Sequence, residues 1–523
     1  MCPKIGSIDI IIREEDVLRE LQRLDHKKGS GPDAIPGSFL KNTAESLYQP
    51  LCLLFNQSLM TEYFPKSWKK SFLIPIFKSG ARIDVKNYRG IAILYIIPKL
   101  FELLVYNHIA SKVTSILHPA QHGFKKGCST LSNLMEYCSD ILCNMECGGQ
   151  VDAIYFDFSK AFDQVDHDLL LFELNKYGLN STVCGWLKSY LSGRTQFIKI
   201  DNSKSREISV RSGVPQGSHL GPLLFMTFIN DLAYILNNIK FSFYADDLKV
   251  YEVVNFSNAN KSLQINVSKI AEWCNNNGMR LNSEKCNIIS FTRSNSTILR
   301  TYVIDNNLIK RVNSVKDLGI WLDSKMNFKL HIDKTIAKAN MRLGLIKRFA
   351  KEFNDPYVVK SLYCSLVRSI MEYGSIIWMP IYDVDQCRIE SVQKNFLLFS
   401  LRGLNWSHPF ILLSYRARLR LLSMVALRHR QIINCCLHAH DVLNGKIISP
   451  VLSSRLLRRN IPYGLRHPRE LMEEHHRTTY VLNEPINRCR RFYNRYLSLG
   501  NAYMTRNAYR LALFDYFSRM AST

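Results

Sequence analysis

The spacing of hydrophobic residues predicts helices in the first sixty residues of the chain. Apolar side chains at Val17, Leu21 and Leu24 recur every three or four positions, which is typical of an amphipathic helix over residues 13–25. The Gly- and Pro-rich segment "KKGSGPDAIPGSF" follows and predicts a turn. A second helix is predicted over about 42–60, and it leads to a short strand with the sequence "SFLIPIFK".

Beyond residue 150 the pattern changes to short strands joined by turns. The sequence "AIYFDF" is typical of a short strand, and the next segment predicts a helix with one apolar face. That face would carry Phe162, Val165, Leu169 and Phe172. A later helix is predicted to end at the Asn-rich stop before Gly278, because glycine favours the backbone conformation of a helix C-cap. From about residue 330 the pattern is mostly helical.

The sequence "FSFYADDLKVY" predicts a hairpin with Asp246 and Asp247 at its tip. Like charges this close raise each other's proton affinity, and a divalent cation reverses that penalty. Mg²⁺ prefers carboxylates, waters and substrate phosphates as ligands. Asp157, which ends its own strand, is the candidate third carboxylate of a two-metal site for attack by a 3′ hydroxyl. Asp is also common in solvated turns, so the acidic pair alone admits a purely structural interpretation.

The composition is ordinary for a folded protein except in its charge. The 523 residues are 46% apolar and 22% charged, enough for roughly two to four packed regions. Lys and Arg outnumber Asp and Glu by 69 to 44, and the net charge of +25 suits nucleic acid or an anionic membrane surface. A solvated basic surface is the alternative interpretation.

The cysteines and the apolar stretches bear on the compartment. The 14 cysteines form no dense framework, which favours a reducing, intracellular environment. No signal peptide opens the chain, and its most apolar stretch is interrupted by Pro98, Lys99 and Glu102. We therefore expect no membrane function, and a location in the cytoplasm or the nucleus.

The positive charge is concentrated toward the end of the chain. Residues 401–523 carry 20 Lys and Arg against 6 Asp and Glu. Arginines at 458–459 and 488–495 lie near aromatic residues, which fits RNA or duplex binding by phosphate contact and stacking. A helix that is basic only on its wet face is the alternative. Five residues match no common zinc-ligand spacing and are expected to be ordinary core and surface residues: Cys435, Cys436, His438, His440 and Cys489.

The order of motifs resembles that of the reverse transcriptases of non-LTR, LINE-like retrotransposons, over roughly residues 27–400. The catalytic motifs are "AIYFDFSKAFDQVDH", "SGVPQGSHLGPLLFMTFINDL" and "FYADDLKVY". Upstream, the motifs of the N-terminal extension and fingers are "GSGPDAIP", "FLIPIFKSG", "NYRGIAIL" and "QHGFKKGCST". Downstream, the motifs of the palm and thumb are "GMRLNSEKCNIISF", "VKDLGIWLD" and "LVRSIMEYGSIIW". One such string would be weak evidence, whereas the whole ordered series is specific.

The resemblance implies an α+β, right-hand polymerase fold. Such a fold has fingers, a palm built on an antiparallel sheet with helices, and a helical thumb. The motifs place an N-terminal extension at residues 1–60 and the reverse transcriptase fingers and palm at 61–325. A helical thumb or connection is expected at 326–425, followed by a basic helical C-terminal region at 426–523.

The resemblance also assigns catalytic roles by position. Asp157, Asp246 and Asp247 match the metal-binding triad, which holds two Mg²⁺ ions with Mn²⁺ as a substitute. Phe158, next to the first of these, lends at most a main-chain carbonyl to the nucleotide site. Lys285 matches a lysine that protonates the leaving pyrophosphate, although a solvated lysine is the alternative interpretation.

The nucleotide-binding residues are carried over in the same way. Lys78 and Arg89 fall in the fingers, where basic side chains clamp the triphosphate, and either could instead be a surface charge. Phe162 occupies the place of an aromatic steric gate, which clashes with a 2′ hydroxyl and so selects deoxynucleotides. Its apolar helical face also fits a core residue. Gln216 and Gly217 match residues that pack against the nascent base pair.

Several fingers positions depart from the usual family pattern. Gly90 and Ala92 stand where Pro and Ser are common, and His122, Lys125 and Cys128 stand where Phe or Tyr and two Arg are common. These changes affect the fingers and the template contacts but leave the carboxylates intact. We find no counterpart of the family's endonuclease or of an RNase H, so the chain is expected to lack both.

The expected activity is RNA-directed DNA synthesis, with an RNA template, a DNA primer or target, and dNTPs as partners. Two alternatives remain open from the sequence. The first is an inactive or truncated remnant of the element that only binds nucleic acid. The second is an RNA-dependent RNA polymerase, which an aromatic gate at Phe162 would oppose.

Overall fold

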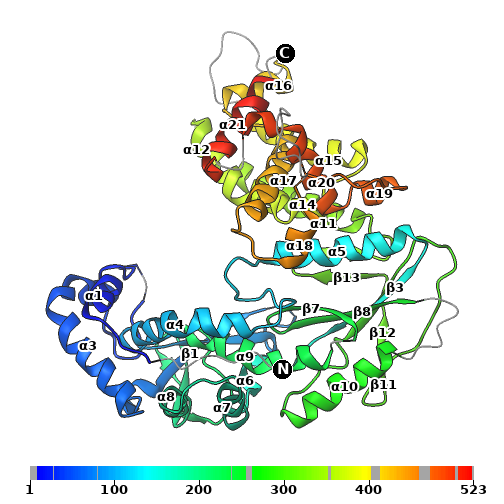
Figure 1. Cartoon of the computed structure of the whole chain (residues 1–523). Helices are drawn as coiled ribbons and strands as arrows, with labels where there is room; N and C mark the ends of the chain where they lie inside the picture. Colours follow the sequence, from blue (N-terminus) through cyan, green and yellow to red (C-terminus); the bar gives the residue numbers. More distant parts are fainter. Residues whose placement is uncertain are drawn as a thin grey trace, which may run out of the picture.

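The structure, a computed structural model, describes residues 9–27, 29–78, 80–236, 238–254, 262–350, 355–401, 413–458, 471–500 and 504–520. A broad part built mainly from the first 325 residues lies below a helical part built mainly from the later residues (Figure 1). Strands and helices are mixed, so the expected α+β class is confirmed. None of the helices in the described ranges combines the length and apolar character that crossing a bilayer requires.

Helices of the broad part surround its two sheets. They are α1 (Glu14–Gln22), α2 (Gly37–Asn42), α3 (Ala44–Met60), α4 (Ile96–Ile116), α6 (Ala161–Gln164), α7 (His167–Lys176), α8 (Ser181–Leu191), α9 (Leu220–Ile235) and α10 (Ser262–Asn276). Helix α5 (Thr130–Glu146) lies between the two parts (Figure 1). The helices predicted over 13–25 and 42–60 correspond to α1 and α3, and Val17 and Leu21 are buried as expected.

The helical part consists of eleven further α-helices in the described ranges. They are α11 (Lys329–Phe349), α12 (Pro356–Tyr363), α13 (Ser369–Glu372), α14 (Ser375–Trp378), α15 (Asp383–Ser400), α16 (Tyr415–Leu421), α17 (Leu427–Leu443), α18 (Pro450–Arg455), α19 (Thr479–Leu482) and α20 (Pro485–Arg495), with α21 (Arg506–Met520) at the end of the chain. The mostly helical pattern predicted from about residue 330 is therefore confirmed.

Two five-stranded sheets form the frame of the broad part. The first has the order β2 (Tyr88–Ile93), β1 (Lys70–Phe77), β4 (Arg194–Ile200) and β5 (Ser203–Lys204), with β6 (Ile208–Val210) also paired to β4. The central sheet has the order β12 (Lys310–Arg311), β9 (Asn287–Phe291), β3 (Gln150–Phe156), β8 (Asp247–Val254) and β7 (Lys240–Tyr244). Two small hairpins complete the strands: β10 (Val303–Ile304) with β11 (Asn307–Leu308), and β13 (Ser314–Asp317) with β14 (Ile320–Asp323).

The central sheet separates two hydrophobic cores. Successive residues of a strand point to opposite faces, so both faces of a buried strand must be apolar. On β3, Ile154 and Phe156 pack into the core of the broad part, whereas Val151 and Ala153 pack into the core shared by α5 and the helical part. The sheet is therefore fixed from both sides, which makes its ends rigid supports for side chains.

The segment after β3 differs from its prediction. A continuous helix with four apolar residues on one face was expected there, but the chain breaks after the short helix α6. The Asp166 side chain accepts hydrogen bonds from the amides of Asp168 and Leu169, both at 2.9 Å, and so caps a new helix, α7. As a result Val165 is buried while Phe172 is 64% exposed, and the single-face prediction was wrong.

The C-terminal region is packed into the protein more closely than its charge predicts. Helix α20 contacts α5, α14 and α17, and it carries Arg488 and Arg490. Arg488 is 4% exposed and donates to the carbonyl oxygens of Ile376, Ile377 and Met379 at 2.7, 2.8 and 2.6 Å. Buried guanidinium groups with internal partners cannot contact phosphates, so the nucleic-acid interpretation was wrong for Arg488 and Arg490.

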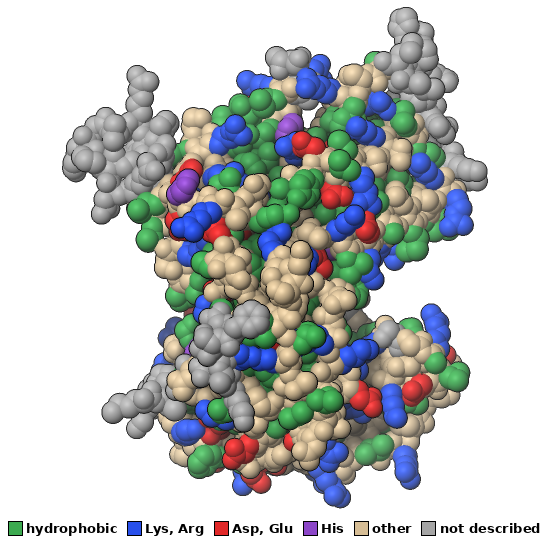
Figure 2. Space-filling view, turned by 90° about the vertical axis from the view of Figure 1, so that its right-hand side faces the viewer, with side chains coloured by type: hydrophobic (Ala, Val, Ile, Leu, Met, Phe, Trp, Pro, Cys, Tyr) green, Lys and Arg blue, Asp and Glu red, His purple; other side chains and the backbone are tan. Residues whose placement is uncertain are grey.

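The other residues considered in this region differ in their exposure to solvent. Arg458 and Arg495 are exposed, while Arg459 lies outside the described residues. The five Cys and His residues considered for zinc are all buried: Cys435, Cys436, His438, His440 and Cys489. On the face shown in Figure 2, Lys and Arg side chains are spread over both parts of the molecule. The positive charge on that face is therefore not confined to the C-terminal region.

We expect Arg488→Lys to destabilise the helical part strongly. A lysine lacks the planar fork that reaches three carbonyl oxygens, so it leaves a buried charge and unpaired acceptors, at a cost of about 2–4 kcal/mol. Arg495→Lys, at an exposed position of the same helix, is the matched control and should leave stability unchanged within about 0.5 kcal/mol. Thermal and urea denaturation measure both, and equal stabilities for the two variants would contradict the internal role of Arg488.

Candidate active site

Three carboxylates lie at one end of the central sheet. Strand β3 pairs with β8 so that Phe156 lies opposite Leu248, which places the next residue, Asp157, beside Asp247. Strands β7 and β8 form the predicted hairpin, in which Tyr244 pairs with Asp247 and the turn consists of Ala245 and Asp246. The hairpin prediction is confirmed, and the strand register brings the three predicted aspartates to the same edge.

The turn of this hairpin is held from outside by a loop that follows α4. Ala245 has a φ of +57°, an unusual conformation for a residue with a side chain. The Gln121 side chain accepts from the amides of Ala245 at 3.0 Å and Gly123 at 2.7 Å, and it also donates to the Ala245 carbonyl at 3.4 Å. A side chain at Gly123 would collide with the backbone of Ala245. Sequence reasoning gave Gln121 no role, because a local motif does not indicate which distant backbone groups its side chains contact.

The electrostatics of the carboxylates are those of a crowded acidic site. Burial raises the pKa of Asp246, and Asp157 raises it further, while Arg89 and Lys78 act in the opposite direction. Asp247 opens to solvent at the end of the sheet, but the surrounding protein and then the charge of Asp246 raise its pKa to about 6. A positive charge added next to these carboxylates would lower their pKa values and stabilise their ionised forms.

The chemistry of the donors fits a divalent cation, although the side chains do not enclose one as they stand. Three carboxylates provide only hard oxygen donors, which Mg²⁺ and Mn²⁺ prefer. Within the described ranges, no three or more His, Cys, Asp or Glu side chains are gathered into a group that could hold a metal ion. Burial and then neighbouring carboxylates raise the pKa values of Asp246 and Asp247, and a bound cation would offset both effects.

Basic side chains from three separate segments face the carboxylates. The Lys285 ammonium lies 3.8 Å from a carboxylate oxygen of Asp157. Burial lowers the pKa of Lys78, Arg89 and Lys285 lower it further, and Asp157 and Asp246 oppose them, so these five charges share one electrostatic environment. The structure therefore brings Lys285 beside Asp157, with Lys78 and Arg89 within electrostatic range of Asp246.

The predicted nucleotide residues are also adjacent to each other. The Phe162 ring stacks on Phe225 of α9, with centroids 4.2 Å apart, and meets Phe124 edge-on at 6.2 Å. It is only half-buried, so the ring is fixed by the core and still reaches the surface. The Gln216 side chain donates to Asp163 at 2.8 Å, which ties the "VPQGS" segment to the residue after Phe162.

Gly217 and Phe158 make backbone contacts that explain their positions. Gly217 has a φ of +114°, and an added Cβ would lie 2.6 Å from the carbonyl oxygen of Ala92 on β2. The Ala92 amide donates to the Gln216 carbonyl at 2.9 Å, so this loop is joined to the strand that carries Arg89. Phe158 is buried and forms an isolated bridge with Leu281.

A cleft of about 330 Å³ opens between the carboxylates and the β13–β14 hairpin, with Asp157, Asp247 and Lys285 in its lining. A buried ion pair joins its two walls: the Lys249 ammonium on β8 lies 2.6 Å from Asp317 on β13, and both side chains are 5% exposed. The ammonium also lies 4.3 Å from the centroid of the Tyr137 ring. Sequence reasoning missed this pair, since only the inward position of Lys249 within an apolar strand hints at a partner.

Comparison with known proteins identifies the class of the domain. Residues 74–322 match the family model described as "Reverse transcriptase (RNA-dependent DNA polymerase)", which covers the carboxylates, the basic side chains and the cleft. The chain therefore contains a reverse transcriptase domain.

The relatives identify the group within that class. The chain is 30% identical over 397 residues to the "Probable RNA-directed DNA polymerase from transposon BS" of Drosophila melanogaster, a match that covers 73% of this chain and 44% of the relative. It is 28% identical to the "Probable RNA-directed DNA polymerase from transposon X-element" of the same organism, over 75% of this chain and 44% of the relative. The "RNA-directed DNA polymerase from mobile element jockey" is 30% identical over 61% of this chain and 36% of its own length.

These matches confirm the resemblance to the reverse transcriptases of non-LTR retrotransposons. The chain spans less than half the length of the curated relatives that it matches.

We expect the Lys249–Asp317 pair to stabilise the cleft walls only as a pair. Lys249→Met leaves a buried carboxylate without its cation and should cost about 3–5 kcal/mol, whereas adding Asp317→Asn should recover part of that loss. The exposed pair of Lys240 and Asp140, at 2.7 Å, is the control, and its coupling free energy should be below about 1 kcal/mol. Double-mutant cycles from urea denaturation provide both values, and a coupling no larger for the buried pair would refute this assignment.

Proposed function

We propose that the chain is an RNA-directed DNA polymerase, which extends a primer 3′ hydroxyl with dNTPs on an RNA template. The observation that carries the proposal is the meeting of Asp157, Asp246 and Asp247 at one sheet end inside a matched reverse transcriptase domain. The relatives' names include the same activity for proteins of which this chain covers less than half. The template, the primer and the dNTPs are thus the proposed partners.

In this proposal the molecule is a right-hand polymerase. Residues 61–325, with both large sheets, would form the fingers and palm, and residues 1–60 an extension of them. The helices of 326–425 would form the thumb or connection. Support comes from the arrangement of parts in Figure 1, where the helical part lies above the broad part and the β13 strand lies between them. The growing duplex would lie between the two.

The three aspartates would hold the divalent ions, with Mg²⁺ as the proposed pair and Mn²⁺ as a substitute. When bound, such ions favour the ionised 3′ hydroxyl and neutralise charge on the triphosphate. Support comes from the donor set and from the raised pKa values of Asp246 and Asp247, which would return toward ordinary values beside a cation.

The basic side chains would act on the triphosphate itself. Lys78 and Arg89 would clamp its oxygens and stabilise the charge that develops as the bond to the α-phosphate forms. Lys285, which pairs with Asp157 at 3.8 Å, would exchange that partner for the leaving pyrophosphate and give it a proton. Their shared electrostatic environment with the carboxylates supports both roles.

The remaining residues would select the nucleotide. Phe162, held by Phe225 and Phe124, would close the space beneath the sugar and exclude a 2′ hydroxyl. Gln216 and Gly217 would contact the nascent base pair from the segment that the Asp163 and Ala92 contacts hold in place. Phe158 would contribute at most its main-chain carbonyl, as the adjacent residue to Asp157.

Asp246→Asn is expected to reduce primer extension on an RNA template with Mg²⁺ and dNTPs by at least about a hundredfold. The substitution removes one carboxylate that would bind the divalent ions, and these ions would stabilise the charge that develops during the reaction. Asp305→Asn is the matched control, since Asp305 also lies in the turn of a hairpin, but that hairpin is a separate two-stranded sheet that carries none of the proposed site residues. Affinity for template–primer should stay unchanged in both variants. If the wild-type chain binds RNA without extending primers, the chain is a binding remnant and the proposed function is wrong.

Phe162→Ala is expected to relax sugar selection. Removing the ring opens space for a 2′ hydroxyl, so the ratio of dNTP to rNTP incorporation should fall by about tenfold or more. Phe172→Ala, at the exposed position on the next helix, is the control and should leave the ratio as it is. Single-nucleotide extension with matched dNTP and rNTP measures the ratio, and an unchanged value in Phe162→Ala would assign the ring to the core alone.

A further inference from the structure

The loop that supports the catalytic turn is itself held by the C-terminal region. Residues 120–123 lie along the edge strand β7: the His122 amide donates to the Phe243 carbonyl at 3.1 Å, and the Phe243 amide donates to the Ala120 carbonyl at 3.0 Å. The same segment supplies Gln121 to the turn. Any displacement of this segment is therefore transmitted to the backbone of Ala245.

One residue of the C-terminal region, Ile448, binds the far side of that loop. The Ile448 amide donates to the Gly127 carbonyl at 2.8 Å, and the Cys128 thiol donates to the Ile448 carbonyl at 3.2 Å. Gly127 has a φ of +80°, and an added Cβ would lie 2.6 Å from Cγ1 of Ile448. The next residue, Ser449, donates its hydroxyl to Glu136 on α5.

Buried polar contacts link this attachment to the turn. His122, which is almost completely buried, lies 2.9 Å from the Ser132 hydroxyl and 3.4 Å from the second carboxylate oxygen of Glu136. Glu136 is therefore shared between His122 on the loop and Ser449 of the C-terminal region. Buried polar groups that lose a partner are costly, so the three residues constrain one another.

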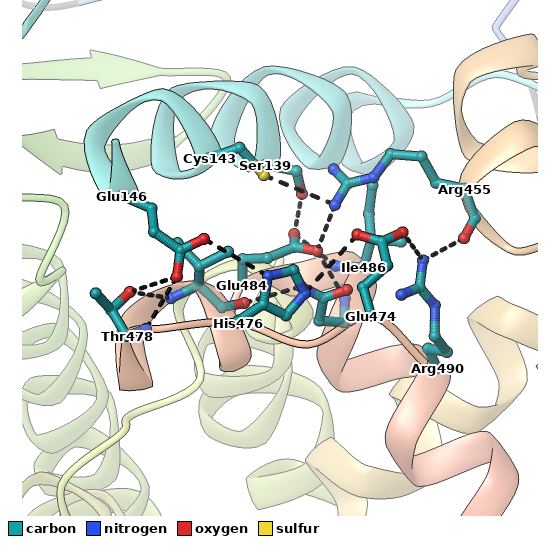
Figure 3. A network of polar contacts seen from close by, with 12 residues as sticks. Ser139, Cys143, Glu146, Arg455, Glu474, His476, Thr478, Glu484, Ile486 and Arg490 are labelled. Carbon is teal, nitrogen blue, oxygen red and sulfur yellow. Dashed lines mark hydrogen bonds and ion pairs between the residues drawn. The ribbon is translucent and has the colours of Figure 1, made fainter. Parts of the chain in front are cut away.

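The C-terminal region follows α5 from Glu136 to its end at Glu146. The residues of α5 that it contacts are spaced three, four and three positions apart, so they form one polar stripe on the helix: Glu136, Ser139, Cys143 and Glu146. Figure 3 shows three of them facing the C-terminal region. The Ser139 hydroxyl donates to Glu484, Arg455 contacts Cys143 at 3.8 Å, and Glu146 accepts from the Thr478 amide at 2.9 Å.

The centre of this contact is a buried ion pair. Glu484, with no exposed surface, pairs with Arg455 at 3.1 Å and also accepts from the amides of Ile486 and Asn487 at 2.9 and 2.8 Å. It therefore caps helix α20 while it binds α5. Helix α5 also reaches the central sheet, because Asn133, one turn before Glu136, donates to the Phe243 carbonyl at 2.9 Å.

We infer that the C-terminal region is a positioning element for the catalytic turn: it docks on the polar stripe of α5, and it holds the loop that fixes Ala245, directly through Ile448 and through Glu136 by way of Ser449. The catalytic consequence of this inference rests on the proposed polymerase function. It also gives a reason for two departures from the family pattern, since Cys128 contacts Ile448 directly and His122 contacts Glu136, which Ser449 also binds.

The test uses glycine variants of the full chain. Gly127→Ala drives a methyl group into Ile448, and Gly148→Ala is the matched control because Gly148 has a similar φ of +75° with nothing within 4 Å of an added Cβ. Both variants carry the same backbone strain. The double variant Gly127→Ala with Ile448→Ala removes the colliding side-chain atoms, and Ile448→Ala alone accounts for their loss.

The first measurement is amide hydrogen exchange, which needs no activity. In Gly127→Ala, peptides covering 120–123 and 240–248 should exchange about tenfold faster, while peptides covering strand β9 keep their rates. The double variant should return toward wild-type rates, and Gly148→Ala should match wild type. Unchanged exchange at 240–248 in Gly127→Ala, or an equal increase in Gly148→Ala, would overturn the inference.

The second measurement is single-nucleotide extension. Gly127→Ala should lower kcat by about tenfold to a hundredfold, because displacement of a reacting group by about an ångström has that effect, and leave the KM for dNTP unchanged. A loss of kcat in Gly127→Ala that the second substitution does not reverse counts against the inference. If the wild-type chain extends no primer, the proposed function fails, and the exchange rates alone decide whether the C-terminal region positions the turn.

Discussion

The crowding of negative charge at one end of the central sheet is the constraint on which the site depends. Two adjacent aspartates in a hairpin turn and a third on the neighbouring strand repel one another, so an isolated hairpin would relax away from this geometry. The turn cannot relax, because β3 is buried between two cores and Gln121 binds both sides of Ala245. The free energy of burying the two cores therefore keeps the three aspartates close together, although their mutual repulsion opposes this placement. A bound cation would reduce that repulsion.

Both cores combine apolar packing with buried polar groups. The core of the broad part meets β3 through Ile154 and Phe156, and the same strand carries the buried Asp152, which accepts from Ser290 and Tyr302. The core of the helical part also contains buried charges with internal partners, among them Lys249, Glu484 and Arg488. Apolar contacts tolerate small shifts of one helix on another, whereas a buried ion pair has one favourable geometry. The polar contacts therefore fix the register of the helical part on the sheet that carries the carboxylates.

The sequence predicted local features and failed where contacts are distant. The hairpin of β7 and β8, the strand before Asp157 and the helices α1 and α3 follow from periodicity and turn residues, which act over a few positions. The prediction of one helix after β3 failed because a single cap at Asp166 interrupted an otherwise apolar pattern. The ordered motifs named the aspartates and the basic residues that face them.

Partners far apart in the chain were beyond that reasoning. The contact of Gln121 with Ala245 spans 124 residues and that of Cys128 with Ile448 spans 320, and no local pattern encodes either. The same limitation explains the wrong interpretation of Arg488 and Arg490. Net charge counts residues without regard to their surroundings. The guanidinium group of Arg488 is buried and donates its hydrogen bonds to three carbonyl oxygens. A basic composition indicates a nucleic-acid surface only through the side chains that remain exposed, such as Arg495 on the same helix. For the C-terminal region, the internal contacts therefore say more about its role than its charge does.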